Sequence, residues 1–402
     1  MVPLILTTML FMLSQDVFAK AAHLKDVIGA AFSKNPEIQS LQKKVQAKIE
    51  YSKGQSALSD PMIGVSQLER GNVTRYWTIA QRIDFPFKYN LREKIQRSKA
   101  DEVKQLLEEV RLALRAEVIT TYYGIYAIQK IKELTRNDLE KIKEFSRIAE
   151  TKYAAGSAPM QDSMKAHFIQ TQVEADLIAL NQEEDGLQAR MGELVGQLSP
   201  TDFMLAKLDL PVPNLSLSAI KLNADSSPLI KQKQVELESA QLETRLSRLG
   251  YAPDFQLRYQ GYLSGDPKSS QIITLEMSVP LWFWGKTANE KAAVWQQASK
   301  EFELSNAVQS VEARISSLKS KVRNQFELLN IFKTSLIPQA VTSYESSIDA
   351  YKASKINFLE LLDSERSLLK VQIAYFRTLT QYIASVTQLE LSLGQAISGL
   401  GT

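Results

Sequence analysis

Two carboxylates three residues apart, Glu360 and Asp363, are the residues of this sequence that best suit ion chemistry. At this spacing on a helix the two side chains share one face. If that face lined a narrow passage, mutual repulsion would favour cations, and protonation or a bound multivalent cation would relieve it. The spacing alone also allows a solvated outer face.

Catalytic and metal chemistry find little support. The chain has no Cys and only two His, His23 and His167, which removes thiolate metal sites and cysteine nucleophiles. The run Gly285-Lys286-Thr287 resembles the end of a phosphate-binding loop, but Pro280 stands where that motif needs glycine. Because no nucleophile, base and orienting group can be assembled, we expect no enzyme activity, no cofactor and no metal site. We interpret His167 as a packed or interfacial side chain.

The charge balance gives no reason to expect a nucleic-acid partner. Lys and Arg total 48 against 45 Asp and Glu, and the net charge of +3 is dispersed along the chain. Only 16 Gly and 13 Pro occur in 402 residues. Such low numbers are typical of long helices rather than of compact loops.

The longest helical pattern lies between residues 90 and 151, where there is no Pro and a single Gly. About 60 residues can run there as one helix roughly 90 Å long, at about 1.5 Å per residue. On the return arm, side chains at a 4-3-4-3 spacing predict a coiled-coil seam. The expected seam consists of Met164, Phe168, Thr171, Ala175 and Ile178.

The turn of this hairpin is repeated 198 residues later in the sequence. Small residues, Gly156 and Ser354, interrupt the two helical patterns in the way that a tight helix-to-helix turn tolerates. We therefore predict hairpin tips at about 153–160 and 351–358. Their side chains would let a partner helix approach closely, and the candidate docking residues are Tyr153, Ala154, Ala155, Gly156, Ser157, Tyr351, Ala353, Ser354 and Lys355.

Matching prolines indicate that the whole chain is a tandem duplication. Pro36 matches Pro228, 192 residues later, and Pro61 matches Pro253 at the same offset. Each of these prolines punctuates or ends a helical pattern, as proline does. The sequence therefore divides into a first repeat, 20–197, a linker or belt, 198–226, and a second repeat, 227–402.

After each matched proline, alternation with period two predicts a pair of strands. In the second repeat, Ile273, Leu275 and Met277 alternate with Thr274 and Glu276. Each strand has roughly the 9 to 11 residues that a tilted strand needs to cross a bilayer. A soluble β-hairpin with one face on the helices is the alternative. The expected strands are about 61–69, 73–85, 254–263 and 271–279.

Four strands cannot close a barrel, and open edges in lipid would leave backbone N–H and C=O groups without partners. Several chains would therefore share one barrel. Two chains would give a cylinder filled by side chains, whereas three would give twelve strands and room for a lumen. A conduit favours three.

The N-terminal segment and an aromatic cluster bear on export and membrane contact. Residues 1–19 contain an apolar run from Val2 to Leu13 and end in Val17-Phe18-Ala19, a small-x-small pattern. Both features are typical of a signal peptide, although a basic start is lacking. A buried hairpin helix is the alternative. Beyond them no stretch approaches the roughly 20 apolar residues of a membrane helix, so a span would consist of strands. Trp282, Phe283 and Trp284 could form an interfacial aromatic belt or could pack the strand-to-helix corner.

These features resemble the TolC family of outer membrane efflux proteins over essentially the whole mature chain. The resemblance rests on Asn35-Pro36-Glu37, on the proline-aromatic-glycine corner at residues 280–285, and above all on residues 351–363. The last segment is similar to the family's tip segment without a gap. The resemblance implies a mainly α fold with a small β part. It also implies a homotrimer, with a twelve-stranded β-barrel in the outer membrane and a twelve-helix tunnel through the periplasm.

The same resemblance implies partners and a gate. The tips would meet a periplasmic adaptor and an inner-membrane pump of the resistance-nodulation-division type, and the chain would act as a passive conduit in contact with outer membrane lipid. Glu360 and Asp363 match two acidic positions that line the family's periplasmic constriction. The chain departs from the family pattern where Ser354 replaces the tip glycine and where Arg366 interrupts the seam.

Two other classes of protein stay open. A secreted coiled-coil scaffold would explain the rods but not four strands at matched positions. A periplasmic adaptor has a single hairpin and would not require a duplication. The short external loops resemble the branch of the family that serves heavy-metal pumps, but no Met, His or Cys cluster supports metal contact. The sequence does not identify the exported substrate.

Overall fold

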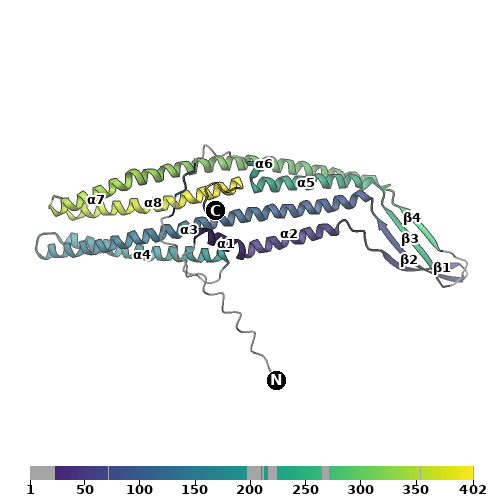
Figure 1. The fold of residues 1–402 in the computed structure, drawn as a ribbon, viewed down its shortest axis with the longest axis horizontal. Helices are drawn as coiled ribbons and strands as arrows, with labels where there is room; N and C mark the ends of the chain where they lie inside the picture. The colour runs from purple at the N-terminus through teal and green to yellow at the C-terminus, as the bar shows by residue number, and fades with distance from the viewer. Residues whose placement is uncertain are drawn as a thin grey trace, which may run out of the picture. The chain divides into compact units, whose positions relative to one another are not determined.

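The protein is mainly helical with one small antiparallel sheet, as the sequence predicts (Figure 1). It divides into two compact units, and each unit contains segments from both sequence repeats. In this computed structural model the expected signal peptide, most of the linker and Ser354 lie outside the described residues. The described residues are 23–70, 72–196, 210, 212–215, 224–264, 271–353 and 355–401.

Unit 1 comprises Met1–Ile38, Val110–Ala224 and Glu312–Thr402 and is built from two helical hairpins. No helix in the described part of the chain has both the length and the apolar character needed to cross a membrane. The helices that contribute to unit 1 are α1 (Leu24–Lys34), α3 (Pro86–Ala154), α4 (Met160–Val195), α6 (Phe283–Ile331), the π-helical turn η3 (Phe332–Leu336), α7 (Ile337–Lys352) and α8 (Phe358–Leu393).

The apolar stripe of α4 has a different phase from the predicted coiled-coil seam. Met164, Phe168 and Ile178 are 59%, 62% and 70% exposed, and the other two predicted seam positions are exposed as well. The buried stripe instead contains Ala166 and Ile169. The prediction was wrong because two stripes of similar period run along α4. The chain buries the stripe that contains Ala166, Ile169 and Val173, which packs against α3 and α8.

Unit 2 comprises Gln39–Glu109 and Asp225–Val311 and carries the sheet. The first parts of α3 and α6 lie in it, together with most of α2 (Pro36–Gly54) and with α5 (Pro228–Arg248). Two short 3-10 helices, η1 (Ala224–Ser226) and η2 (Leu249–Tyr251), flank α5. The strands are β1 (Met62–Arg70), β2 (Asn72–Ile83), β3 (Phe255–Ser264) and β4 (Ile272–Met277).

The sheet has the order β1-β2-β3-β4, and all its pairs are antiparallel. The central β2–β3 pair joins the two sequence repeats, since β2 comes from the first and β3 from the second. Gly261 on β3 pairs with Trp77 on β2, and a Cβ atom at Gly261 would lie 2.5 Å from the Trp77 ring. This position therefore requires glycine. Strands β1 and β4 form the two outer edges of the sheet.

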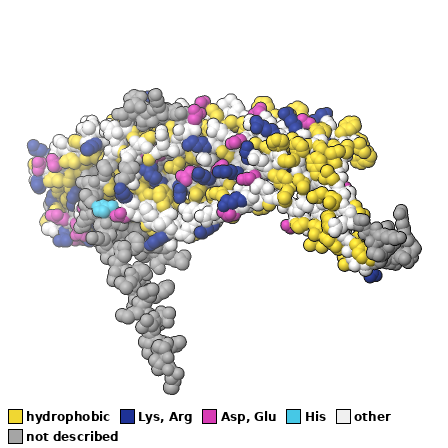
Figure 2. All heavy atoms as spheres, turned by 45° about the vertical axis from the view of Figure 1, so that its right-hand side comes forward, with side chains coloured by type: hydrophobic (Ala, Val, Ile, Leu, Met, Phe, Trp, Pro, Cys, Tyr) yellow, Lys and Arg dark blue, Asp and Glu magenta, His cyan; other side chains and the backbone are white. Residues whose placement is uncertain are grey.

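Apolar side chains of the sheet point to the exterior of unit 2. On β4, Ile273 and Leu275 are 72% and 69% exposed, while the alternating Thr274 and Glu276 are half-buried. Figure 2 shows hydrophobic side chains gathered over the part of the molecule that carries the strands. This arrangement is the reverse of a soluble sheet, in which the apolar face is the buried one.

Candidate functional site

The first hairpin tip lies in unit 1, between α3 and α4. Gly156 adopts φ 69°, the left-handed conformation that favours glycine. Its N–H donates to the Tyr153 carbonyl at 2.9 Å, and the Ser157 N–H donates to the Lys152 carbonyl at 2.8 Å. These bonds satisfy carbonyls at the end of α3. Tyr153, Ala154, Ala155, Gly156 and Ser157 are all exposed, as a docking surface requires.

The second tip joins α7 to α8 and is organised by a side-chain cap. The Asn357 Oδ1 accepts a hydrogen bond from the Glu360 N–H at 2.9 Å, and Asn357 Nδ2 donates to Glu360 Oε1 at 2.9 Å. Both bonds stabilise the first turn of α8. Ala353 and Lys355 are exposed, whereas Tyr351 is half-buried. Ser354 lies outside the described residues.

A polar contact connects the two tips. The Lys152 Nζ donates to the Tyr351 hydroxyl at 3.1 Å and lies 4.2 Å from the centroid of the Tyr351 ring. A hollow of about 260 Å³ opens beside this contact. It is lined by Ala149, Lys152, Ser157, Ala158, Pro159, Asp162, Tyr351, Ile356, Asn357 and Phe358.

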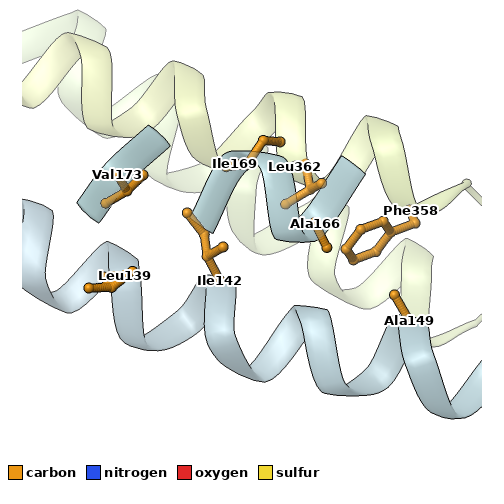
Figure 3. Packing of buried hydrophobic residues seen from close by; sticks show 8 residues of the cluster. All are labelled: Leu139, Ile142, Ala149, Ala166, Ile169, Val173, Phe358 and Leu362. Atoms are coloured by element: carbon orange, nitrogen blue, oxygen red, sulfur yellow. The ribbon is translucent and has the colours of Figure 1, made fainter. Parts of the chain in front are cut away.

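The tips are held together by a shared apolar core (Figure 3). Phe358 and Leu362 of α8 pack against α3 and α4 of the other hairpin. Their exposed fractions are 3% and 2%, so the two hairpins form one packed structure near the tips. The remaining members of this core are Leu139, Ile142, Ala149, Ala166, Ile169 and Val173.

Glu360 and Asp363 both lie on α8, just past the second tip, and both are exposed. Glu360 is also the partner of the Asn357 cap, so its carboxylate has a structural role that the sequence did not reveal. Asp363 lines a second hollow of about 610 Å³ between α3, α4 and α8. Their role as a gate is not tested by a single chain and stays a prediction.

His167 of α4 is exposed and lies against α3, so it is interfacial rather than packed. Its Nδ1 lies 3.3 Å from Ser146 Oγ and its Nε2 lies 2.7 Å from Glu150 Oε1, so both ring nitrogens have partners on α3. Among the described residues, no group of three or more His, Cys, Asp and Glu side chains could hold a metal ion.

Sequence reasoning missed a group of charged residues buried behind the tips. Asp138 on α3 and Glu365 on α8 are only 4% and 1% exposed. Both stand in apolar stripes, Glu365 between Leu362 and Leu368 and Asp138 beside Leu139. A carboxylate at a stripe position was the signal that could have identified them.

The aromatic corner lies in unit 2, where α6 begins. Trp282, Phe283 and Trp284 are 67%, 62% and 64% exposed. The rings of Trp282 and Trp284 are stacked, with centroids 5.7 Å apart and planes at 11°. Exposure of all three rings fits an interfacial belt better than the packing of a corner, although the surroundings of these rings in a membrane stay a prediction.

The described residues thus combine two helical hairpins with a four-stranded sheet that exposes apolar side chains. The model of the family described as "Outer membrane efflux protein" matches residues 219–395. The second repeat is therefore similar to this family.

Known proteins extend the similarity beyond the second repeat. The cobalt-zinc-cadmium resistance protein CzcC of Cupriavidus metallidurans is 21% identical over 330 residues, which cover 79% of this chain and 77% of that protein. A membrane protein from Pseudomonas aeruginosa has a similar crystal structure, with a TM-score of 0.80, 15% identity and coverage of 92% of this chain and 93% of that one. The outer-membrane channel OprN is similar with a TM-score of 0.79, 16% identity and coverage of 94% and 91%. At these identities the structural matches establish the fold.

Proposed function

We propose that this chain is the outer membrane channel of a tripartite efflux system. In this role it is a passive conduit that crosses the outer membrane and extends into the periplasm. The observation that carries the proposal is the outward apolar face of β4, where Ile273 and Leu275 are exposed. Lipid is the solvent that stabilises such a face. The family match and the similarity to OprN support it.

The two alternatives explain less. A secreted coiled-coil scaffold has no use for exposed apolar side chains on a sheet, and a periplasmic adaptor needs only one hairpin. The chain supplies two hairpins and one sheet, as a channel subunit of this family would. An enzymatic role has no support from the family, and we propose none.

The sheet supports a trimer. Its edge strands, β1 and β4, have no further partner in the described chain, and open edges are not stable in lipid. Pairing of β1 from one copy with β4 from the next would close twelve strands in three copies. Three chains would also place twelve helices around one axis. Partners of this trimer would be a periplasmic adaptor and an inner-membrane pump, and the resemblance to the TolC family implies a pump of the resistance-nodulation-division type.

Purification from outer membranes tests this proposal. We expect a detergent-stable trimer with about three times the chain mass of 45.2 kDa. Leu275→Lys should reduce assembly in the membrane, because a Lys at the lipid face near the midplane costs about 2–4 kcal/mol. Thr274→Lys, on the other face of the same strand, is the matched control and should have a smaller effect. A monodisperse monomer that stays soluble without detergent would contradict the proposal.

A further inference from the structure

Asp138 and Glu365 are buried carboxyl groups that lack a full set of partners. No hydrogen bond of normal geometry reaches Asp138 Oδ2 or either carboxylate oxygen of Glu365 within the described residues. Buried acceptors without donors are strongly unfavourable. A proton on Asp138 Oδ2 would supply a donor where the two carboxyl groups otherwise offer only acceptors.

The groups around the pair come from three helices of unit 1. Lys141 of α3 lies 3.0 Å from Glu365 Oε1, and its Nζ is 4.8 Å from the ring centroid of Tyr344 on α7. Arg366 of α8 also acts on Asp138 electrostatically. Tyr344 is buried, and its pKa is raised by burial first and by the Glu365 carboxylate next, so the phenol stays protonated at neutral pH. Glu144 of α3 acts on Tyr344 in the same direction.

A polar hollow connects the pair to the exterior. Asp138 lines the hollow of about 610 Å³, together with Asp363 and Arg366. Water and protons can therefore reach Asp138 although its side chain is buried. The other charged and amide side chains at this hollow are Gln172, Asp176 and Lys370.

The electrostatic balance places the titration of Asp138 near neutrality. Burial is the largest cause, and the nearby Glu365 carboxyl group adds to it, raising the pKa of Asp138 to about 7. Lys141 and Arg366 act in the opposite direction. The packed state thus binds a proton that an exposed Asp would release at a much lower pH. Lys141 and Arg366 reduce the rise in the pKa of Asp138 but do not cancel it.

We propose that Asp138 and Glu365 share one proton and form a pH-dependent latch that holds α3 of the first hairpin against α8 of the second. When the proton is present, Asp138 is neutral and donates to a Glu365 carboxylate paired with Lys141. When it is lost, two carboxylates are buried side by side, and they repel each other in a medium of low dielectric.

The raised pKa of Asp138 determines the direction in which pH acts on the latch. A group that binds its proton more tightly in the packed state favours that state at low pH, and this contribution is lost as the pH rises through the pKa of the packed state. The latch is therefore closed below about pH 7 and loosened above it. This property belongs to unit 1 alone and does not depend on the proposed channel function.

The distance between α3 and α8 measures the latch directly. Because the chain has no Cys, Asn137→Cys and Ser367→Cys give a clean pair of spin-label sites. Both positions are exposed and uncharged, so labelling leaves the local charge unchanged. The full-length labelled protein, mixed in detergent with an excess of unlabelled chain, is measured by pulsed electron spin resonance from about pH 5.5 to about pH 8.5. We expect a short, narrow distance at low pH and a longer, broader one above neutrality.

Four variants separate this latch from a purely structural contact. Asp138→Asn cannot ionise, so the short distance should persist at every pH. Glu365→Gln removes a group that raises the pKa of Asp138, so the transition should move to lower pH. Lys141→Met removes a group that lowers it, so the transition should move to higher pH. Asp176→Asn, an exposed carboxylate at the same hollow, is the control and should leave the transition in place.

Three results would overturn the latch. The first is a wild-type distance that does not change with pH. The second is an Asp138→Asn protein that keeps the transition. The third is a pH transition that moves in the same direction in Glu365→Gln and in Lys141→Met. This third result tests the latch even if Asp138→Asn does not fold.

Discussion

A single buried carboxylate, Glu390 on α8, fixes the C-terminal segment of unit 1. Its Oε1 accepts hydrogen bonds from the Ile397 and Ser398 N–H groups, both at 2.7 Å, and from Ser398 Oγ at 2.6 Å. Its Oε2 accepts from Arg115 of α3 at 2.6 Å. Arg115 also donates to the Leu400 carbonyl at 2.5 Å, so one ion pair orders both a helix contact and the chain end.

Removing Glu390 should destabilise unit 1 strongly. Glu390→Ala leaves Arg115 buried without a counter-charge, and breaking such a pair costs about 3–5 kcal/mol. Glu140→Ala, which breaks an exposed pair with Lys143, is the control and should cost less than about 1 kcal/mol. Denaturant unfolding followed by circular dichroism measures both. Equal losses in the two variants would mean that the buried pair contributes no more than a surface pair.

Buried charges were the residues that the sequence identified least well. Glu390 follows Leu389 and precedes Leu393 in an apolar stripe, which signals a buried carboxylate. Its partner Arg115 lies 275 residues away, and no local pattern specifies a contact at that separation. The same holds for Asp138 and Glu365, which come from different repeats.

At the scale of elements, two glycines at helix ends, Gly156 and Gly196, differ in how much space surrounds them. Gly156 at the first tip and Gly196 after α4 have φ 69° and 73°. A Cβ atom at Gly156 meets nothing within 4 Å, whereas one at Gly196 would lie 2.8 Å from the Lys34 carbonyl oxygen at the end of α1. Gly156 is needed only for its left-handed backbone conformation. Gly196 is needed for that conformation and also for the close contact between α4 and α1.

Alanine substitutions should separate these two roles. Gly156→Ala should cost about 1–2 kcal/mol, the strain of the left-handed conformation. Gly196→Ala should cost clearly more, because the clash with a backbone oxygen must move α1. Denaturant unfolding gives the two free energies, and proteolysis of α1 reports its release. If Gly196→Ala costs no more than Gly156→Ala and α1 stays protected, the close contact does not constrain the fold.

Helices and strands were predictable, but helix phase was not. Absence of proline predicted a helix over about 60 residues, and α3 has 69. Strands expected at about 73–85 and 254–263 occur at Asn72–Ile83 and Phe255–Ser264. Local chemistry determines such elements. The face that α4 buries depends on helices that are distant in the sequence, and this face contains Ala166 and not Phe168.

At the scale of the assembly, the exposed tips are the surfaces where we propose that an adaptor docks. Ala155→Trp and Ala353→Trp should block docking and abolish export, because both side chains are small and exposed. We choose Ala155 rather than Gly156, since a Trp at φ 69° would strain the turn itself. Ala179→Trp, at an exposed alanine within α4, is the control. Export of a pump substrate and crosslinking to the adaptor are the measurements. Normal export by a correctly assembled Ala155→Trp, Ala353→Trp channel would exclude docking at these turns.

The gate hypothesis also belongs to the assembly, since one chain contributes only Glu360 and Asp363. Three chains would bring six carboxylates around one axis, and their mutual repulsion in a narrow ring should favour cations. Glu360→Gln with Asp363→Asn removes the charge but keeps side-chain size and a polar partner for the Asn357 cap. In planar bilayers we expect this double variant to lose cation selectivity and block by trivalent metal ions.

The same recordings distinguish the gate from the latch. Asp138→Asn should keep the selectivity and the metal block of the wild type, because Asp138 is buried and Glu360 and Asp363 are exposed. The double variant should keep the pH-dependent distance between α3 and α8. Equal selectivity and equal metal block in the wild type and the double variant would place Glu360 and Asp363 outside the passage, and the constriction would then have to be formed by other residues.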